Sequence, residues 1–546
     1  MSRRIDFILK LNFNTTLKLT IVRKLKIFFA LLSLNAFFSC KTNEGNVDQR
    51  ASSKLIEIDV KGLSKAYLAE EISVKEVLQF YVDRTNTIDK QGPELNSIIA
   101  LHPNIWGRAE ELDAELAAGK WRGPLHGIPV LIKDNIDVSG MPTTAGSRAM
   151  KDSYPEQSSF LITQLEEAGA LIMGKTNLSE WANFRGLNSS SGWSGVGGQT
   201  KNPYVLNRTP CGSSSGSGVA IAANLAVLAV GTETNGSIVC PCSVNGIVGI
   251  KPTVGLVSRQ GIIPISETQD TAGPMTRTLA DAVYMLEAMK GRDNRDSKTL
   301  NDLAEQNLTE HLKKGGLKGK RIGVYYAREG RYSQMDSLFQ SALQTMKSLG
   351  AELIDIDEIT SSKTSSFSFQ VMIHEYKDGL EAYFKSNPNG VESLEALIAF
   401  NEKDTIETKF YGQQYLEMAQ ESGGKNAETY KKALDSLNYY SKSDGLDKVL
   451  KAYNLDAIVS PTRSPAWVID RVSGDSGGYG ISSSSYAAWS GYPSITVPMG
   501  AIYGLPVGIS FFSEAWTEAK LIEIAYDYEQ SSLKRKPPVF IGNLEF

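Results

Sequence analysis

Histidine is scarce in this sequence of 546 residues, which contains only His102, His126, His311 and His374. None of them lies in a recognisable base motif, and we predict that His126 only packs or caps a turn. Hydrolases with a Ser-His-Asp triad need a histidine as general base. The composition therefore argues against such a triad, although "GSSSG" around Ser214 and "GDSGG" at 474–478 formally match serine-nucleophile patterns.

Cysteine is equally rare, with four residues in the chain. After Cys40 only Cys211, Cys240 and Cys242 remain, and two of these are crowded into "CPC". An odd number in this arrangement is not a disulfide framework, so we expect none. With no histidine nearby we expect no zinc site, and the reading developed below needs neither a metal nor an organic cofactor.

The apolar run "IFFALLSLNAFF" at 27–38 is too short to cross a bilayer as a helix. Three basic residues at positions 23, 24 and 26 precede it, and Cys40 follows it, an order that resembles a bacterial lipoprotein signal. We therefore expect residues 1–39 to be a signal peptide, Cys40 to be lipidated and residues 40–53 to be a tether. The protein would then be a membrane-anchored lipoprotein or a periplasmic protein of the bacterial cell envelope. The alternative is a short buried helix in a cytosolic protein.

The formal net charge is −4, and its distribution is uneven. The first 39 residues hold seven Lys or Arg and one acidic residue, so the remainder is more acidic than the total indicates. Phosphate contacts need clustered basic side chains, so we expect no nucleic-acid partner. We expect contact with a membrane only through the N-terminal lipid anchor, and either a monomer or a homodimer.

Continuous apolar segments alternate with stretches of helical periodicity. Residues 128–132 and 170–177 are typical of strands covered on both faces, and "FLITQLEEAG" between them is typical of a helix. "KRIGVYY", "AELIDID" and "LDAIVSPT" predict further strands, while residues 362–445 look helical. This alternation indicates an α/β fold with a largely parallel sheet.

Where histidine is absent, a neutral lysine can deprotonate a serine near neutral pH. Lys133 is the candidate because it ends the apolar strand "IPVLI". Burial removes the hydration of an ammonium group and lowers its pKa. A fall from about 10.4 toward 7 corresponds to roughly 4 kcal/mol. The alternative is that Lys133 forms an ion pair with Asp134 or Asp137 at the end of the strand.

Several segments together resemble the amidase signature family of serine amidohydrolases, and most closely its peptide amidases. They cover roughly residues 55–535 and occur in the family's order: "LHGIPVLIKDNIDVSG", "GKTNLSEWANFRG", "PCGSSSGSG", "GTETNGSIVCP", "VNGIVGIKPTVGLVSRQGIIPIS", "AIVSPTRSPAW", "SGYPSITVPMG" and "GLPVGISFF". The resemblance implies a large, mixed, mostly parallel, twisted sheet with helices on both faces. It also implies an amidase domain at 54–546, in which 300–445 is a variable, mainly helical insertion region.

Carried over by motif, the family's Ser–Ser–Lys triad falls on Lys133, Ser213 and Ser237. The resemblance implies that Ser237 is the nucleophile, and that Ser213, after a cis peptide bond, relays the proton to Lys133. Backbone N–H groups near the nucleophile would form the oxyanion hole: Thr234, Asn235, Gly236 and Ser237. The implied activity is hydrolysis of carboxamide C–N bonds through an acyl-enzyme. Peptide C-terminal amides are the first candidate substrates, and small aliphatic or aryl amides are the next.

Three positions depart from the commonest family wording. Asn235 stands for a glycine, Val239 for a frequent arginine and Ser215 for a glycine. Similar wording occurs in the branch that resembles peptide amidases, so we interpret the departures as marks of a subgroup. The alternatives are an inactive homologue, the A subunit of a glutamyl-tRNA amidotransferase, and a non-catalytic ligand-binding lipoprotein.

Overall fold

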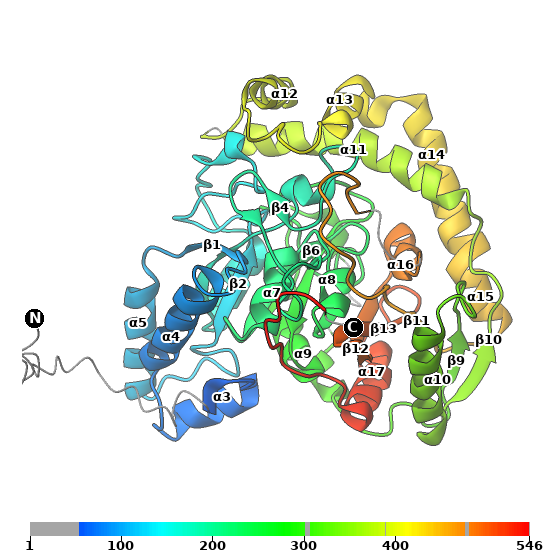
Figure 1. The fold of residues 1–546 in the computed structure, drawn as a ribbon, viewed down its shortest axis with the longest axis horizontal. Coiled ribbons are helices and arrows are strands. Elements are labelled where there is room, and N and C mark those ends of the chain that lie inside the picture. The colour runs from blue at the N-terminus through cyan, green and yellow to red at the C-terminus, as the bar shows by residue number, and fades with distance from the viewer. Residues whose placement is uncertain (1–53, 301–305, 388, 476–479, 545–546) are drawn as a thin grey trace, which may run out of the picture. The chain divides into compact units, whose positions relative to one another are not determined.

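One eleven-stranded sheet runs through the computed structural model, which describes residues 54–300, 306–387, 389–475 and 480–544 (Figure 1). The predicted signal peptide, tether and Cys40 lie outside the described residues. The strand order is β1–β3–β2–β6–β8–β7–β12–β13–β11–β9–β10. In chain order the strands are β1 (Ile98–Leu101), β2 (Pro129–Lys133), β3 (Leu171–Thr176), β6 (Leu228–Glu233), β7 (Val248–Lys251), β8 (Thr271–Thr276), β9 (Arg321–Val324), β10 (Glu352–Asp355), β11 (Ala457–Pro461), β12 (Ser494–Ile502) and β13 (Leu505–Phe512). A separate small sheet pairs β4 (Trp193–Ser194) with β5 (Gly198–Gln199).

The mixed sheet confirms the predicted fold class, but most neighbouring strands pair antiparallel. Parallel pairing is confined to β3–β2–β6 and to β11–β9–β10. The expectation of a mostly parallel sheet was therefore wrong. Its physical reason is that an apolar run buried on both faces indicates burial and not direction. The antiparallel middle arises from connections such as β12 to β13, whose two-residue link cannot cross over the sheet.

Helices flank the sheet in groups. The longer ones are α3 (Val60–Leu68), α4 (Val74–Arg84), α5 (Ile105–Ala117), α6 (Phe160–Glu167), α7 (Ser215–Ala222), α8 (Val239–Val244), α9 (Leu279–Met289), α10 (Ser333–Ser348), α11 (Thr364–Ser386), α12 (Leu394–Lys403), α13 (Gln414–Glu421), α14 (Glu428–Asn438), α15 (Asp447–Ala452), α16 (Ser484–Ser490) and α17 (Glu518–Ser532). α7 and α8 contact each other and the central strands. In a second group, α17 packs against both α9 and α10.

Local sequence signals set several of these boundaries. The Ser73 hydroxyl accepts a hydrogen bond from the Glu76 N–H, and the Glu76 carboxylate accepts one from the Ser73 N–H. This reciprocal capping box starts α4 where the sequence predicts it. The predicted small-residue helix and strand after the serine cluster are α7 and β6, and both are buried along their whole length.

The region at 300–445 contains both helices and the two strands predicted at "KRIGVYY" and "AELIDID". Helices α11 to α14 follow one another there, along the top and right of Figure 1. The same region also contributes β9 and β10, which form one edge of the main sheet. It is thus built into the sheet at one end and forms a helical layer at the other.

A buried ion cluster joins this helical layer to the body. The guanidinium of Arg185 donates to Glu180 at 2.6 Å and to Glu407 at 2.9 Å, and all three side chains are at most 1% exposed. Glu180 belongs to the 3-10 turn Glu180–Asn183, whereas Glu407 follows α12. Arg185 also donates to the backbone oxygens of Glu407 and Tyr411. Burying a guanidinium is tolerated only where partners of this kind neutralise it.

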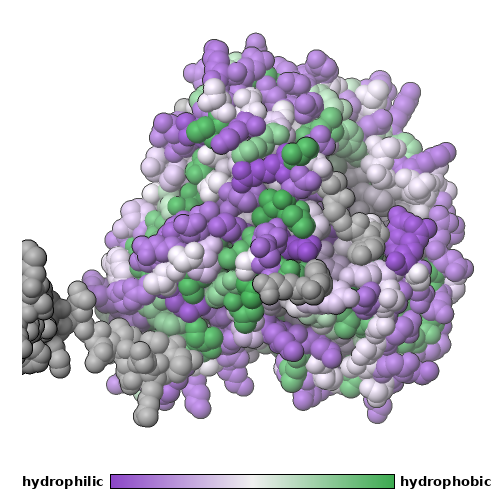
Figure 2. Space-filling model, viewed as in Figure 1, coloured by the Kyte–Doolittle hydropathy of each residue, from purple (hydrophilic) through white to green (hydrophobic). Residues whose placement is uncertain are grey.

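Hydrophilic residues cover most of the surface that Figure 2 presents, with apolar residues in small groups between them. No helix in the described ranges combines the length and the apolar character that crossing a bilayer requires. The apolar side chains are instead concentrated on the sheet, where β2, β3, β6, β11 and β13 are buried throughout.

Leu228 tests this core. It is fully buried at the start of β6, so Leu228→Ala should lower the free energy of unfolding by about 2–5 kcal/mol through lost burial and the cavity left behind. Leu68→Ala is the matched control, because Leu68 is 61% exposed at the end of α3. Urea titration followed by circular dichroism measures both variants. Equal midpoints for the two would contradict the buried position of β6.

Candidate active site

The site lies where two parallel strands end side by side. β2 pairs with β6 in parallel register, with Val130 opposite Leu228 and Ile132 opposite Val230. Lys133 is the last residue of β2, and Thr232 lies near the end of β6. Because carboxyl ends of parallel neighbours meet at one edge of a sheet, the two side chains can reach the same point.

The amine of Lys133 is completely enclosed. Its Nζ lies 2.7 Å from Ser213 Oγ, 2.8 Å from Thr232 Oγ1 and 3.2 Å from the Thr232 carbonyl oxygen. Lys133 and Ser213 are both 0% exposed. The structure therefore brings the predicted lysine and the predicted relay serine, 80 residues apart in the chain, into direct hydrogen-bond contact.

Burial lowers the pKa of Lys133 to about 7, because the ammonium form loses its hydration. The carboxylates of Asp270 and Glu233 act in the opposite direction and raise it. A substantial fraction of the amine is therefore uncharged near neutral pH, which a general base requires.

Lys133 forms no ion pair with Asp134 or Asp137, so that alternative is wrong. Asp134 is instead paired with the buried Lys175, whose Nζ lies 3.0 Å from Oδ1. Asp137 accepts a hydrogen bond of 2.8 Å from the hydroxyl of Tyr383 in α11. Both carboxylates thus have other partners, and Lys133 is left to the serine.

Ser213 lies in a tightly packed loop just before α7. The Gly212–Ser213 peptide bond is cis, as the resemblance implies. A Cβ on Gly212 would lie 2.1 Å from Ser179 Oγ, so only glycine fits at this close approach. The Ser213 carbonyl accepts a hydrogen bond from the Ser179 N–H at 3.0 Å, which anchors the loop from the other side.

Ser237 lies in the loop between β6 and α8, next to this first loop. The Ser214 N–H donates to the Ser237 carbonyl oxygen at 3.2 Å, which joins the two loops. The Ser237 side chain has no hydrogen-bond partner among the described residues, and the residue is 8% exposed. The two loops are thus joined through the backbone of Ser214, and no hydrogen bond links the Ser213 and Ser237 hydroxyls in the part of the chain that the structure describes.

The backbone of the loop that carries Ser237 leaves N–H donors available. Gly236 has a φ of 81°, a left-handed conformation that favours glycine. Glu233 Oε2 accepts from the N–H groups of Ile238 and Val239 at 2.8 and 3.0 Å. The preceding N–H groups donate to no group in the described part of the chain, and they are the predicted oxyanion donors: Thr234, Asn235, Gly236 and Ser237.

The three departures from family wording each have a place in the structure. Asn235 Oδ1 accepts a hydrogen bond of 2.9 Å from Ser484 Oγ, at the start of α16. Ser215 Oγ donates to the Cys211 carbonyl oxygen at 2.6 Å. Val239 is fully buried. The two polar replacements therefore brace the loops around Ser213 and Ser237 through side-chain bonds that a glycine could not make.

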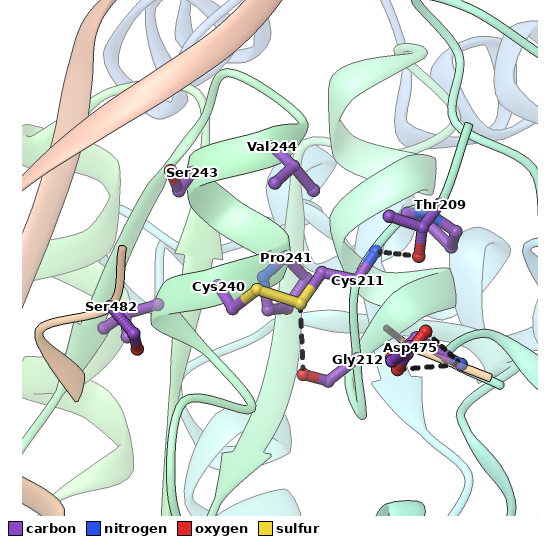
Figure 3. Close-up of a disulfide and its surroundings, with 12 residues drawn as sticks. Thr209, Cys211, Gly212, Cys240, Pro241, Ser243, Val244, Asp475 and Ser482 are labelled. Carbon is purple, nitrogen blue, oxygen red and sulfur yellow. Dashed lines mark hydrogen bonds between the residues drawn. A yellow bond between two sulfur atoms is a disulfide. The ribbon is translucent and has the colours of Figure 1, made fainter. Parts of the chain in front are cut away.

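The cysteine count predicted no disulfide framework, and the structure contains one disulfide that the count did not indicate. Cys211 and Cys240 are bonded (Figure 3), with their Cα atoms 6.0 Å apart. Cys242 is free and buried. The odd cysteine count gave no warning, because the count cannot exclude one pair that the fold brings together. The bond joins the segment before Ser213 to the helix after Ser237.

The formal serine patterns have structural explanations. Ser214 Oγ donates to the Thr232 carbonyl oxygen at 3.0 Å, so it braces β6. Of "GDSGG", residues 476–478 lie outside the described residues. His126 is buried, stacks on Trp121 with ring centroids 5.3 Å apart, and has its Nε2 3.1 Å from the Leu112 carbonyl oxygen. The packing role predicted for His126 is therefore confirmed.

A cavity of about 320 Å³ opens beside Lys133's neighbours Asn135 and Thr232. The segment after β7, including Ile263 and Ile265, and helix α11 both contribute to its lining. Charged side chains from these and other segments also line it: Glu233, Arg259, Glu267, Asp270, Arg295, Asp296, Glu375, Asp378 and Lys425. Within the described ranges, no group of three or more His, Cys, Asp or Glu side chains is arranged to hold a metal ion.

Sequence reasoning missed three residues that shape the site. Thr232 supplies two acceptors to Lys133, and Glu233 caps α8. Asp270 accepts from the Thr234 hydroxyl at 2.5 Å and from the N–H groups of Ile265 and Ser266. Glu233 carried no local signal, because it lies six residues before the first residue of α8. Asp270 is distant in the chain and gave none.

Comparison with known proteins gives a consistent assignment. The amidase family model matches residues 76–522. The native peptide amidase of Stenotrophomonas maltophilia is 46% identical with a TM-score of 0.86, covering 89% of this chain and 99% of that one. An amidase family protein of Bacillus anthracis is 34% identical with a TM-score of 0.83, covering 91% and 96%. A protein of Arabidopsis thaliana named as a probable amidase is 37% identical over 501 residues, 89% of this chain and 92% of its own length.

The chain is also similar, at lower identity, to a protein that is named for a different role. The A subunit of glutamyl-tRNA(Gln) amidotransferase from Alkaliphilus metalliredigens is 31% identical over 491 residues, 87% of this chain and 97% of that protein. The family match, the peptide amidase neighbours and the mixed sheet point the same way. The chain therefore belongs to the amidase family and is an enzyme that hydrolyses amide C–N bonds.

Proposed function

We propose that Ser237 is the nucleophile, Ser213 the proton relay and Lys133 the general base of this amidase. The observation that carries the proposal is the 2.7 Å contact between Lys133 Nζ and Ser213 Oγ in a site closed to solvent. A lysine with a pKa of about 7 can hold or release a proton at neutral pH, as the role requires.

The contacts of Lys133 suit both of its protonation states. As an ammonium it has three N–H bonds for three acceptors, which are Ser213 Oγ and the two oxygens of Thr232. As a neutral amine it keeps two N–H bonds, and Thr232 can accept both. The lone pair then faces Ser213 and can take the hydroxyl proton. The site therefore need not rearrange when the proton arrives.

The reaction follows from this arrangement. Ser237 Oγ attacks the amide carbon while its proton passes to Ser213, whose own proton passes to Lys133. The negative charge on the carbonyl oxygen is stabilised by the backbone N–H groups at 234–237. The C–N bond then breaks, and the proton returns through Ser213 to the departing nitrogen. Water attacks the ester on Ser237 with the same base, and the carboxylic acid leaves.

We propose peptides with a C-terminal amide as the substrates, which would release ammonia. Support comes from the 46% identity to peptide amidases and from a cavity within the roughly 300–1,000 Å³ range of small-molecule sites. Isoleucines and charged side chains both line the cavity, which suits a chain of amide groups with mixed side chains. Small aliphatic or aryl amides are the second substrate class to test.

The A subunit of a glutamyl-tRNA amidotransferase remains the second use of this chemistry, on the strength of the 31% identity. The peptide amidases are the more similar group. Ammonia release by the isolated protein from amidated peptides supports the hydrolase, whereas co-purification with a tRNA-binding partner would support the subunit. Labelling of Ser237 by a fluorophosphonate separates both enzymes from a non-catalytic lipoprotein.

Ser237→Ala tests the proposed nucleophile. Without a hydroxyl at this position no acyl-enzyme forms, so ammonia release should fall by at least about 10³-fold. Ser348→Ala, at the end of α10, is the matched control and should leave the rate unchanged. Release is measured with an amidated dipeptide by a coupled ammonia assay. Activity of Ser237→Ala near that of the wild type would rule out the assignment.

The proposed base predicts a pH profile. kcat/KM should rise with pH through a midpoint near the Lys133 pKa of about 7. One pH unit below that midpoint it should be about tenfold lower than its plateau at high pH. Asp270 and Glu233 face the amine and raise its pKa. Asp270→Asn removes one of these charges and should shift the midpoint to lower pH, whereas Ser348→Ala should not. A shift to higher pH in Asp270→Asn would contradict the proposed base.

We further propose export to the cell envelope with a lipid on Cys40. Support comes from the basic and apolar order before Cys40, and from a disulfide, which is rare in reducing compartments. In bacteria expressing the full chain, the mature protein should begin at Cys40, carry a lipid mass and be found with membranes. Cys40→Ala should lose the lipid, and an unprocessed soluble wild type would contradict the proposal.

A further inference from the structure

The disulfide lies between the two loops that hold the serines. Cys211 is two residues before Ser213, and Cys240 is three residues after Ser237. In Figure 3 the bond joins the segment at Gly212 to the first turn of α8. Each cysteine is thus two or three residues away from Ser213 or Ser237, and the disulfide links the two loops covalently.

Cys211 is held in an unusual conformation. Its φ is 55°, in the left-handed region that residues other than glycine rarely adopt. Such a conformation persists only where the surroundings fix it. Here the Cys211 N–H donates to Thr209 Oγ1 at 3.1 Å, its carbonyl accepts from Ser215 Oγ at 2.6 Å, and its sulfur is bonded to Cys240. The crosslink is therefore one of three restraints on the residue that leads into Gly212–Ser213.

Cys240 is connected to the nucleophile loop by its own backbone. Its N–H donates to the Gly236 carbonyl oxygen at 2.8 Å, and Gly236 immediately precedes Ser237. Displacing Cys240 would therefore displace the turn that presents both the hydroxyl and the N–H groups at 234–237. Both ends of the disulfide act on backbone that the proposed reaction uses.

The other connections between the loops are hydrogen bonds. One runs from the Ser214 N–H to the Ser237 carbonyl oxygen at 3.2 Å. Asn245, just after α8, donates from Nδ2 to the Pro210 carbonyl oxygen at 2.9 Å and so holds the first loop to the end of that helix. The Ser237 hydroxyl contributes no bond of its own to a described residue. The backbone of the two loops therefore sets the separation of the Ser213 and Ser237 hydroxyls. The disulfide is a covalent link between these loops.

We propose that the Cys211–Cys240 disulfide is a positioning element for catalysis, which holds the Ser213 relay against the Ser237 nucleophile. This inference rests on the proposed roles of the two serines. A displacement of about 1 Å in a reacting group can cost about 10²-fold in rate. Loss of the crosslink should therefore lower kcat more than it changes KM, because neither cysteine lines the cavity proposed to bind the substrate.

Reduction gives a reversible version of the same change. Dithiothreitol donates two electrons and two protons, the Cys211–Cys240 bond becomes two thiols, and the reagent becomes a cyclic disulfide. Both cysteines are nearly buried, at 6% and 7% exposure, so complete reduction has to be verified by thiol labelling. Reoxidation should restore the original kcat.

The test compares Cys211→Ser/Cys240→Ser with Cys242→Ser. Cys242 lies in α8 two residues beyond Cys240 and forms no crosslink, so its variant is a matched control for cysteine replacement in that helix. The rates are measured with an amidated dipeptide at a temperature about 15 °C or more below the unfolding midpoint of each variant, so that every variant is folded. We expect kcat of the double variant to fall about tenfold or more. KM should stay within about twofold, and Cys242→Ser should match the wild type.

Three outcomes overturn the proposal. The first is an unchanged kcat in the double variant, or in fully reduced wild type should the double variant fail to fold. The second is a loss of activity that disappears on cooling, which would make the bond a stabiliser only. The third is mass spectrometry of the mature protein with Cys211 and Cys240 as free thiols. If Ser237→Ala were active, the proposed function would fail instead, so the two failures are distinguishable.

Discussion

The exclusion of water from the Lys133 amine is the constraint on which the rest of the site depends. An exposed lysine would be protonated at neutral pH and could not accept a proton from a serine. Here the amine is at the end of a fully buried strand, and its polar partners are oxygens supplied by the neighbouring strand and by the loop before α7. The sheet thus supplies both low polarity and fixed geometry. With a lysine in such surroundings, the site does not need a histidine as its base.

Much of the fold was predictable because local patterns carry it. Apolar runs marked the buried strands, and Ser73 with Glu76 marked the start of α4. Strand direction was not predictable, since β6 is equally apolar beside its parallel neighbour β2 and its antiparallel neighbour β8. Direction follows from how the chain returns to the sheet, which residues within a strand do not encode.

The site was predictable to the extent that it is local in sequence motifs. Lys133 was predicted from its place at the end of an apolar strand and Ser213 from the resemblance to the amidase family's motifs, and the structure brings them into contact. The environment that tunes them was not found. Asp270 acts on Lys133 through space, and the Cys211–Cys240 pair depends on two loops meeting, so neither has a pattern within a short window. Sequence therefore predicts the reacting groups better than it predicts what adjusts them.

The ion cluster around Arg185 limits how this enzyme can diversify. Helix α11 contributes to the lining of the cavity, so exchanging the helical layer is an obvious route to new substrates. Glu407 belongs to that layer, whereas Arg185 belongs to the body. A replacement segment that lacked an acidic residue at this point would leave the buried guanidinium paired with Glu180 but without the carboxylate that Glu407 supplies. Recombination between relatives should consequently succeed more often when Arg185 and Glu407 come from the same parent sequence. The two positions should therefore vary together.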